Sequence, residues 1–240
     1  MFTQFLTALL RRNDDPPEYV QLDSLQSTGA RSVAGVCGIT PSGKHIIYLK
    51  NDTVHIRKRA IKKDTCIELP NTVPHGINGT SITCMALSED SAFLGCVDGS
   101  IFVVSLITDD ITIANVRAFE RGDCITALSV EGSFVLAASS SANWGLFRYD
   151  SESNSLHHEA QPRANDRNTI KAVSLCPQNP AKGLLAIGSL GSYVDLYSDQ
   201  PICTLRGHGD SIRACAVQNE LGITGSFDMS ARVSAGRPGK

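Results

Sequence analysis

The sequence lacks any apolar run near the roughly 20 residues that a membrane-spanning helix needs. It also lacks a strong excess of one charge, because 22 lysines and arginines stand against 24 aspartates and glutamates. We therefore expect no membrane span, and no overall basic field for nucleic acid or an anionic membrane, so that such binding would need a local patch. With 42% apolar and 19% charged residues among 240, the chain can bury a core and is typical of a globular protein.

Cysteine is sparse and has no metal-binding spacing. The eight cysteines in 240 residues fall well below the density of a disulfide-stabilised scaffold, and no two form a C-x-x-C pair. Several lie in apolar β-like runs, where a free thiol behaves as a small buried hydrophobe. We expect a reducing compartment, with the cytoplasm first and the nucleus as the alternative, and we expect neither a metal nor a cofactor.

The first seventeen residues are a tail that differs from the rest of the chain. Apolar residues recur there at helical spacing, namely Phe2, Phe5, Leu6, Leu9 and Leu10. Arg11 and Arg12 follow, and then the acidic pair Asp14 and Asp15. This pattern predicts a short amphipathic helix that docks or frays, with a mitochondrial targeting segment as the alternative. It contains no convincing secretory signal.

A repeated unit organises residues 18–234. Each copy has a short alternating apolar strand, a polar turn, a second apolar strand ending in small residues, a further turn and a third strand. The equivalent first positions are Val33, Ile82, Ile125, Ile170 and Ile212. Their separations of 49, 43, 45 and 42 residues are close to the 40 to 45 of a four-stranded propeller blade. The copies lie near 32–73, 81–118, 124–160, 169–205 and 211–234, before a C-terminal tail at 235–240.

Turn-forming residues stand between the strands of each copy. The first turn contains Ser42-Gly43, Glu89-Asp90 or Glu131-Gly132, and the second contains Asn51-Asp52, Asp98-Gly99 or Asp228. Short strands with period-two alternation bury one face and need neighbouring sheets to cover the other. The pattern therefore predicts an all-β fold of about five blades.

The last copy carries the most specific motif. Gly207-His208 precedes the first strand, LGITGSFD at 221–228 follows, and Arg232-Val233 lies in the third strand. At these residues the chain resembles a WD-repeat β-propeller. The resemblance covers residues 19–234 and is close to consensus only in the fifth copy.

The resemblance implies a structural role for three residues. In the family, the positions that match His208, Thr224 and Asp228 join a tryptophan in a hydrogen-bonded tetrad within the blade. Here Ser234 stands at the tryptophan position, and Trp144 is the single tryptophan of the chain.

The number of copies leaves two models of the ring open. A seven-bladed ring would need roughly 300 residues, which is more than this chain has. The fifth copy has no outer strand after Ser234, and Glu18–Leu22 could supply it and close a five-bladed ring. The other model is an open arc that is truncated or completed by pairing with another chain at its exposed edge.

Two stretches that look catalytic have simpler explanations. Gly38–His45 comes within one residue of the phosphate-binding pattern G-x-x-x-x-G-K-[ST], but its final position is wrong and a β-like run follows where a helix is needed. His208, Ser226 and Asp228 have the residue types of a hydrolytic triad, yet the repeat assigns His208 and Asp228 to a structural tie. We expect no catalytic residues.

A basic run follows the third strand of the first copy. Its cations are Arg57, Lys58, Arg59, Lys62 and Lys63. Such a run is typical of a solvated loop, and its alternatives are contact with RNA, with an acidic protein surface or with nuclear import machinery.

Resemblance to WD-repeat proteins implies a non-enzymatic scaffold that mediates protein–protein interactions in a multiprotein complex. The loops after the inner strands are the expected contacts. The alternatives are an RNA or ribonucleoprotein binder that uses the basic run and a propeller enzyme with carboxylates at the central channel. The sequence shows no convergent set of acids for the enzyme, and the fold alone does not decide among the three.

Overall fold

The computed structural model describes residues 37–50, 53–58, 63–68, 82–107, 113–161, 169–218 and 221–235. Within these ranges every regular element is a β-strand, and the strands form five antiparallel sheets. This confirms the all-β prediction. Among the same residues, no helix is long and apolar enough to cross a membrane.

Each sheet is a meander of strands that follow one another in the sequence. The first two sheets contain β1 (Cys37–Ile39), β2 (His45–Lys50), β3 (Thr53–Lys58) and β4 (Lys63–Glu68), then β5 (Ile82–Leu87), β6 (Ser91–Cys96), β7 (Ser100–Ser105) and β8 (Ile113–Arg117). The third contains β9 (Ile125–Glu131), β10 (Phe134–Ser139), β11 (Trp144–Asp150) and β12 (Ser155–Ala160). The last two contain β13 (Ile170–Leu175), β14 (Lys182–Ile187), β15 (Leu190–Asp195) and β16 (Gln200–Leu205), then β17 (Ile212–Gln218), β18 (Leu221–Ser226) and β19 (Ala231–Ala235).

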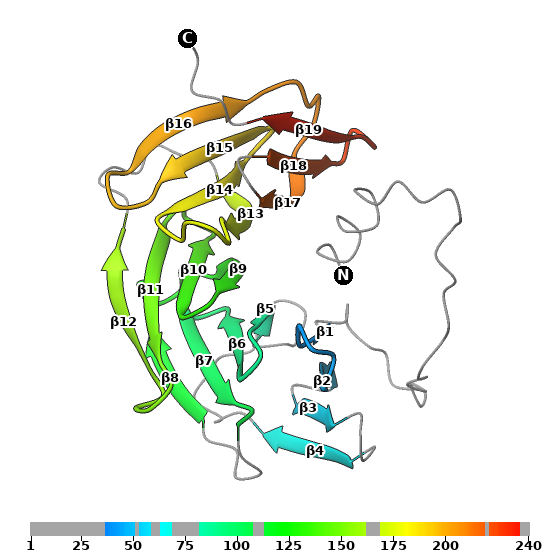
Figure 1. Cartoon of the computed structure of the whole chain (residues 1–240), viewed down its shortest axis with the longest axis vertical. Coiled ribbons are helices and arrows are strands. Elements are labelled where there is room, and N and C mark those ends of the chain that lie inside the picture. The colour runs from blue at the N-terminus through cyan, green and yellow to red at the C-terminus, as the bar shows by residue number, and fades with distance from the viewer. Residues whose placement is uncertain are drawn as a thin grey trace.

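The five sheets lie along an arc (Figure 1), with the first strand of each sheet on the inside and, in the four-stranded sheets, the fourth strand on the outside. The first and fifth sheets form the two ends of the arc. The described residues show a propeller-like arrangement of repeated sheets and no closed ring. The expected first position of copy one, Val33, and the expected closing strand, 18–22, lie outside the described residues, as do the N-terminal tail and residues 236–240.

Neighbouring sheets are joined by buried side chains that alternate between two interfaces. Phe93 and Leu94 are successive residues of β6, yet they belong to different clusters, because successive side chains of a strand point to opposite faces. The first two sheets meet at Ile47, Val54 and Phe102, the second and third at Phe93, Val135 and Phe147, the third and fourth at Leu136, Trp144 and Leu185, and the last two at Leu184, Tyr193 and Val217. Both faces of the inner sheets are therefore buried, which explains why every residue of β6 and β7 is buried.

Hydrogen bonds between successive inner strands repeat along the arc. The Thr83 hydroxyl donates to the carbonyl of Ile125, and the Thr126 hydroxyl donates to the carbonyl of Ile170 at 2.6 Å. Thr83 and Thr126 occupy the same position in their copies, one residue after the apolar residue that begins the strand. One repeated residue thus ties each of these two sheets to the next.

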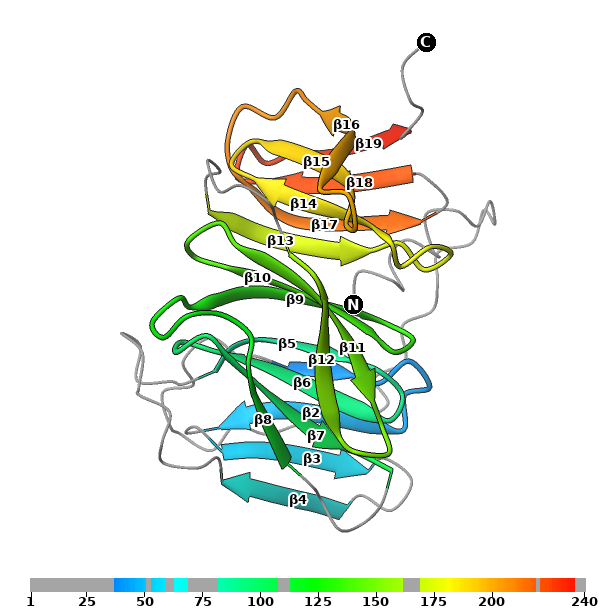
Figure 2. The ribbon, with the colours of Figure 1, turned by 90° about the vertical axis from the view of Figure 1, so that its left-hand side faces the viewer.

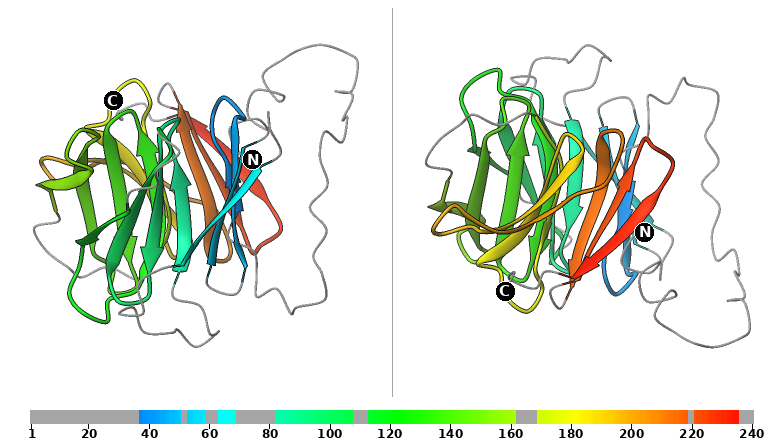
Figure 3. Two further views of the ribbon diagram at one scale, coloured as in Figure 1. Left: turned by 90° about the horizontal axis from the view of Figure 1, so that it is seen from below. Right: turned by 90° about the horizontal axis from the view of Figure 1, so that it is seen from above.

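A second repeated tie lies further along the same strands. The amide of Leu175 donates to the Ser129 hydroxyl at 3.0 Å, and the amide of Val217 donates to the Ser174 hydroxyl at 3.1 Å. The threonine ties join residues at the beginning of two neighbouring inner strands, and the serine ties join residues near the end of the same strands. The inner strands therefore run in the same direction. Figures 2 and 3 show this alignment, with the turns gathered at two opposite sides.

The fifth sheet differs from the others because the structure describes only three strands in it. β19 extends one residue beyond the predicted boundary, to Ala235, because Ala235 still pairs with Leu221. Most of β19 is exposed, whereas its counterparts β7 and β11 pair with a fourth strand and are mostly buried. Exposed apolar side chains gather here, including Phe227, Met229 and Val233.

The described cysteines are free thiols. Cys96 and Cys176 are buried, and Cys66 is exposed. Burial raises the pKa of the Cys84 and Cys215 thiols to about 12, so both stay protonated near neutral pH and pack as small apolar groups.

Candidate interaction site

The common direction of the inner strands gives the molecule two opposite faces on which the turns gather (Figure 3). We call the side with the turns between the first and second strands of each sheet the first-hairpin face, and the side with the turns between the second and third strands the second-hairpin face. Loops on these faces are held by rigid sheets, which is where binding residues commonly lie.

The structure brings His208, Thr224 and Asp228 together on the second-hairpin face. The two ring nitrogens of His208 lie 2.9 Å from Asp228 Oδ2 and 2.9 Å from Thr224 Oγ1. The His208 side chain is only 3% exposed. Ser230, which the sequence analysis did not single out, donates from its hydroxyl to Asp228 Oδ1 at 2.7 Å and lies 3.3 Å from His208 Nδ1.

The tryptophan position lies apart from this cluster, and Ser226 contacts it only through the backbone, because its hydroxyl accepts a hydrogen bond from the amide of Asp228 at 3.2 Å. Ser234 pairs with Gly222 across β18 and β19, and Trp144 is buried between the third and fourth sheets. Ser226 donates to the carbonyl of Asp210 at 2.8 Å. The contacts of His208 are therefore those of a loop-to-strand tie, without a hydroxyl nucleophile placed against a base and a carboxylate.

We expect replacement of His208 by alanine to lower the free energy of unfolding by about 2 kcal/mol, because it removes the ring nitrogen that contacts the buried Thr224 hydroxyl and one of the groups that hydrogen-bond the carboxylate of Asp228. Urea denaturation measures this loss. His157→Ala is the matched control, since His157 is exposed, and it should change stability by less than about 0.5 kcal/mol. Equal stability of the His208 variant and the wild type would contradict a structural role.

Two further carboxylates anchor turns on the same face. Asp98 accepts hydrogen bonds from the amide of Ser100 at 3.0 Å and from its hydroxyl at 2.5 Å, and its Oδ2 lies 3.1 Å from Arg117. Asp98-x-Ser100 has the spacing of Asp228-x-Ser230, so comparison of the copies could have found it.

The third carboxylate on this face belongs to Asp123. Asp98 and Asp228 lie between the second and third strands of their sheets, whereas Asp123 lies just before β9, the first strand of its sheet. It accepts hydrogen bonds from Ser139, Ser140, the amide of Ser141 and the side-chain amide of Asn143, at 2.7 to 3.1 Å. Asp123 stands two residues before Ile125, as Asp210 does before Ile212, so comparison of the copies could have found it, but the sequence analysis missed it.

The acid dependence of stability should follow from these carboxylates. Hydrogen bonds from Ser230 and His208 lower the pKa of Asp228, and for Asp98 and Asp123 hydrogen bonding outweighs the opposing effect of burial, so their pKa values also fall below the ordinary 3.8. A folded-state pKa below the unfolded value contributes stability above pH 3.8 that is lost as the pH falls through the folded pKa. Asp228→Asn should therefore be less stable than the wild type near neutral pH and should approach it in acid. A pH series of urea denaturation curves would contradict this if the difference stayed constant.

The basic run is split between two strands. β3 extends through Lys58 and β4 begins at Lys63, so the loop is shorter than the run. Arg57 and Lys58 are half-buried on β3 and each has an interaction partner. Arg59 and Lys62 lie outside the described residues, and for Lys63 only the strand is described.

Gly38–His45 forms the end of β1, a turn and the start of β2. Gly43 lies in the turn at φ 72°, and its amide donates to the Thr40 carbonyl at 2.8 Å. A strand follows where a nucleotide-binding loop needs a helix N-terminus, so this segment is a hairpin.

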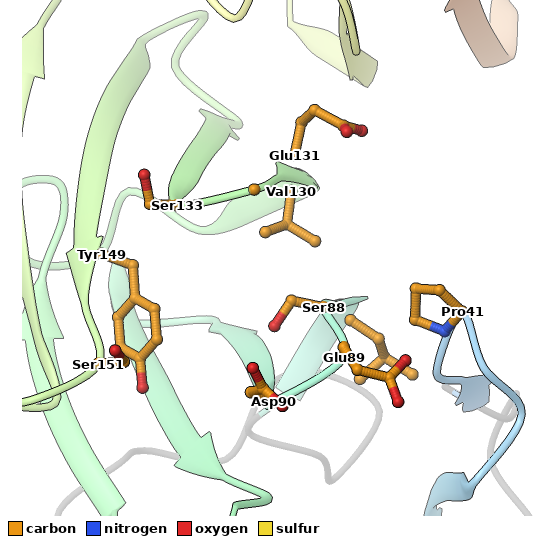
Figure 4. Close-up of a pocket in the computed structure, with 11 residues that line it drawn as sticks. Pro41, Ser88, Glu89, Asp90, Val130, Glu131, Ser133, Tyr149 and Ser151 are labelled. Carbon is orange, nitrogen blue, oxygen red and sulfur yellow. The ribbon is translucent and has the colours of Figure 1, made fainter.

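The first-hairpin face contains a cleft of about 430 Å³. Turns from three successive sheets line it (Figure 4): Pro41, then Leu87 to Asp90, then Val130 to Ser133, with Tyr149 and Ser151 from the third sheet. The carboxylates Glu89, Asp90 and Glu131 make its lining acidic. Sequence reasoning assigned these residues only to hairpins, although it expected the loops after the inner strands to be contacts.

The walls of the cleft are held by polar contacts. Glu89 accepts a hydrogen bond from the Ser42 amide at 2.9 Å and another from the Ser42 hydroxyl, and it pairs with Lys44 at 3.3 Å. The bonds from Ser42 lower the pKa of Glu89. The contacts of Glu89 with Ser42 and Lys44 link the turns of the first and second sheets.

Tyr149 fixes the opposite wall. Its hydroxyl accepts from Ser91 Oγ at 3.0 Å and donates to Asn154 Oδ1 at 2.9 Å, and its ring meets Phe93 edge to face. The cleft therefore lies between turns whose positions are set by contacts from one sheet to the next. Among the described residues, no group of three or more His, Cys, Asp or Glu could hold a metal ion.

The sequence matches no protein-family model and no curated protein. Many solved structures resemble the fold, and one is the crystal structure of the computationally designed Ika8 protein, with a TM-score of 0.63 at 14% sequence identity. The match covers 80% of this chain and 55% of the design, so the chain spans about half the length of that protein. At this identity the likeness supports the fold alone.

Proposed function

We propose that the chain is a non-enzymatic scaffold of the WD-repeat type, which binds protein partners in a reducing compartment through its first-hairpin face. The observation that carries the proposal is the cleft built by turns of three successive sheets on that face. A rigid stack of sheets with a concave, mixed polar and apolar site is suited to hold a partner without performing chemistry on it. The resemblance of the fifth copy to WD repeats supports the same function.

Ring closure belongs to the same proposal. The exposed third strand of the fifth sheet is suited to accept one more strand, as β7, β11 and β15 each do in their own sheets. Residues 18–22 and a second chain are both able to supply it. A monomeric mass in solution favours the first source, and a concentration-dependent dimer favours the second.

The scaffold function is tested by affinity purification with two variants, each of which carries an added tryptophan on the surface. Ser133→Trp fills the cleft from an exposed position, and Arg121→Trp places the same bulk at an exposed position on the second-hairpin face. Quantitative mass spectrometry should show that proteins retained by the wild type are lost with Ser133→Trp and kept with Arg121→Trp. Retention of the same proteins by both variants would contradict binding through the first-hairpin face, and substrate turnover by the purified chain would contradict a non-enzymatic role.

A further inference from the structure

The cleft has an apolar part that can hold a side chain. Leu87 and Val130 come from the ends of β5 and β9, and Pro41 comes from the first turn of the first sheet. Figure 4 shows the Val130 side chain pointing into the cleft toward Ser88. Burying apolar area here would supply about 25 cal/mol per Å² of favourable free energy, so one aliphatic side chain of a partner would add measurable affinity.

The charge around this apolar part is negative and only partly compensated. Glu89 is neutralised by Lys44, but within the described residues Asp90 and Glu131 form no ion pair. Burial raises the pKa of Glu131, which means that its ionised form has lost some hydration without gaining a cation. A lysine or arginine of a partner would compensate for this lost hydration, whereas a phosphate or an acidic side chain would be repelled.

The positions of the two acids constrain the shape of the partner. Asp90 is an exposed residue of the turn between β5 and β6, and Glu131 ends β9 in the next sheet. In Figure 4 the side chains of Val130 and Glu131 point in opposite directions, so Glu131 stands at the rim while Val130 faces the interior. An extended segment alternates its side chains in the same way, which lets one residue fill the cleft while its neighbour reaches the rim.

We propose that the cleft binds an extended peptide segment in which an aliphatic residue lies beside lysine or arginine, with the aliphatic side chain against Leu87 and Val130 and the cation at Asp90 or Glu131. This inference rests on the proposed scaffold function and names the chemistry of its partner. The negative charge of the cleft disfavours nucleic acid as the occupant.

The test uses the full chain and a fluorescein-labelled peptide of alternating lysine and leucine, with fluorescence anisotropy as the measurement. Asp90→Asn and Glu131→Gln remove charge with little change of shape, and each should weaken binding by up to about fivefold. Glu120→Gln is the matched control, because Glu120 is exposed on the opposite face, and it should bind as the wild type does. Binding to the wild type should weaken at high salt, because both acids are solvent-accessible.

Companion peptides make the outcome decisive. A peptide with glutamate in place of lysine should not bind, and one with serine in place of leucine should bind more weakly than the original. Equal binding by the wild type, Asp90→Asn and Glu131→Gln, binding of the glutamate peptide, or no binding of the lysine peptide would each overturn the proposal. If cellular partners are then still lost with Ser133→Trp, the scaffold function stands and only the cationic ligand is wrong.

Discussion

Replacing Phe93 with alanine is expected to lower the free energy of unfolding by about 3 to 5 kcal/mol, which is the usual cost of emptying a buried phenylalanine site. The Phe93 side chain is fully buried in the cluster that joins the second and third sheets, and its ring packs edge to face on Tyr149 at a centroid distance of 5.1 Å. Truncation removes packing from both sheets at once. Denaturation by urea, followed by circular dichroism, measures the loss.

Phe227→Ala is the matched control for this prediction. Phe227 is 59% exposed, and its described ring contact is Arg213, 4.2 Å from the ring centroid. Its replacement should cost less than about 1 kcal/mol. If both phenylalanine variants lost the same stability, the interface between the second and third sheets would not be a core of the protein.

Replacing Gly99 with alanine is expected to cost at least about 2 kcal/mol, because the change combines backbone strain with a steric clash. Gly99 has φ +85°, and a Cβ atom there would lie 2.7 Å from the carbonyl oxygen of Glu120 and 3.1 Å from that of Asp123. These are backbone atoms, which cannot move aside as the end of a flexible side chain can. The amides of Ala118 and Phe119 also donate to the Gly99 carbonyl, so a shift of this turn would disturb the connection to the third sheet.

Gly122→Ala separates the two causes. Gly122 has a similar φ of +92°, but nothing lies within 4 Å of its Cβ position. Its replacement should therefore cost only the backbone strain, about 1 kcal/mol. Thermal or urea denaturation of the two variants gives the comparison, and equal losses would show that Gly99 does not approach the neighbouring backbone as closely as described.

The order of the sheets could be predicted from the sequence because it rests on local and repeated features. Ile82, Ile125, Ile170 and Ile212 each begin an inner strand, as their spacing indicates. Turn residues such as Gly132 mark where the strands reverse, since a tight hairpin requires positive φ there. Periodicity also predicts that neighbouring sheets must cover both faces of each strand.

The polar anchors and the cleft could be predicted only in part. The contacts of His208 follow from the motif of the fifth copy, whereas the partners of Asp123 lie 16 to 20 residues away in a serine-rich turn that has the composition of any loop. The cleft joins Pro41, Glu89 and Glu131, which belong to turns more than 40 residues apart. Each turn by itself has ordinary hairpin composition, and only the stacking of the sheets places them around one cavity.

The most direct test of lateral stacking is a set of nuclear Overhauser effects between the inner strands of the intact chain. The account predicts cross-peaks from the Leu175 amide to the Ser129 side chain and from the Val217 amide to the Ser174 side chain, since each pair is joined by a hydrogen bond of about 3 Å. Contacts that instead linked β9 or β13 to strands of sheets two places away, or the absence of any contact between successive inner strands, would contradict it.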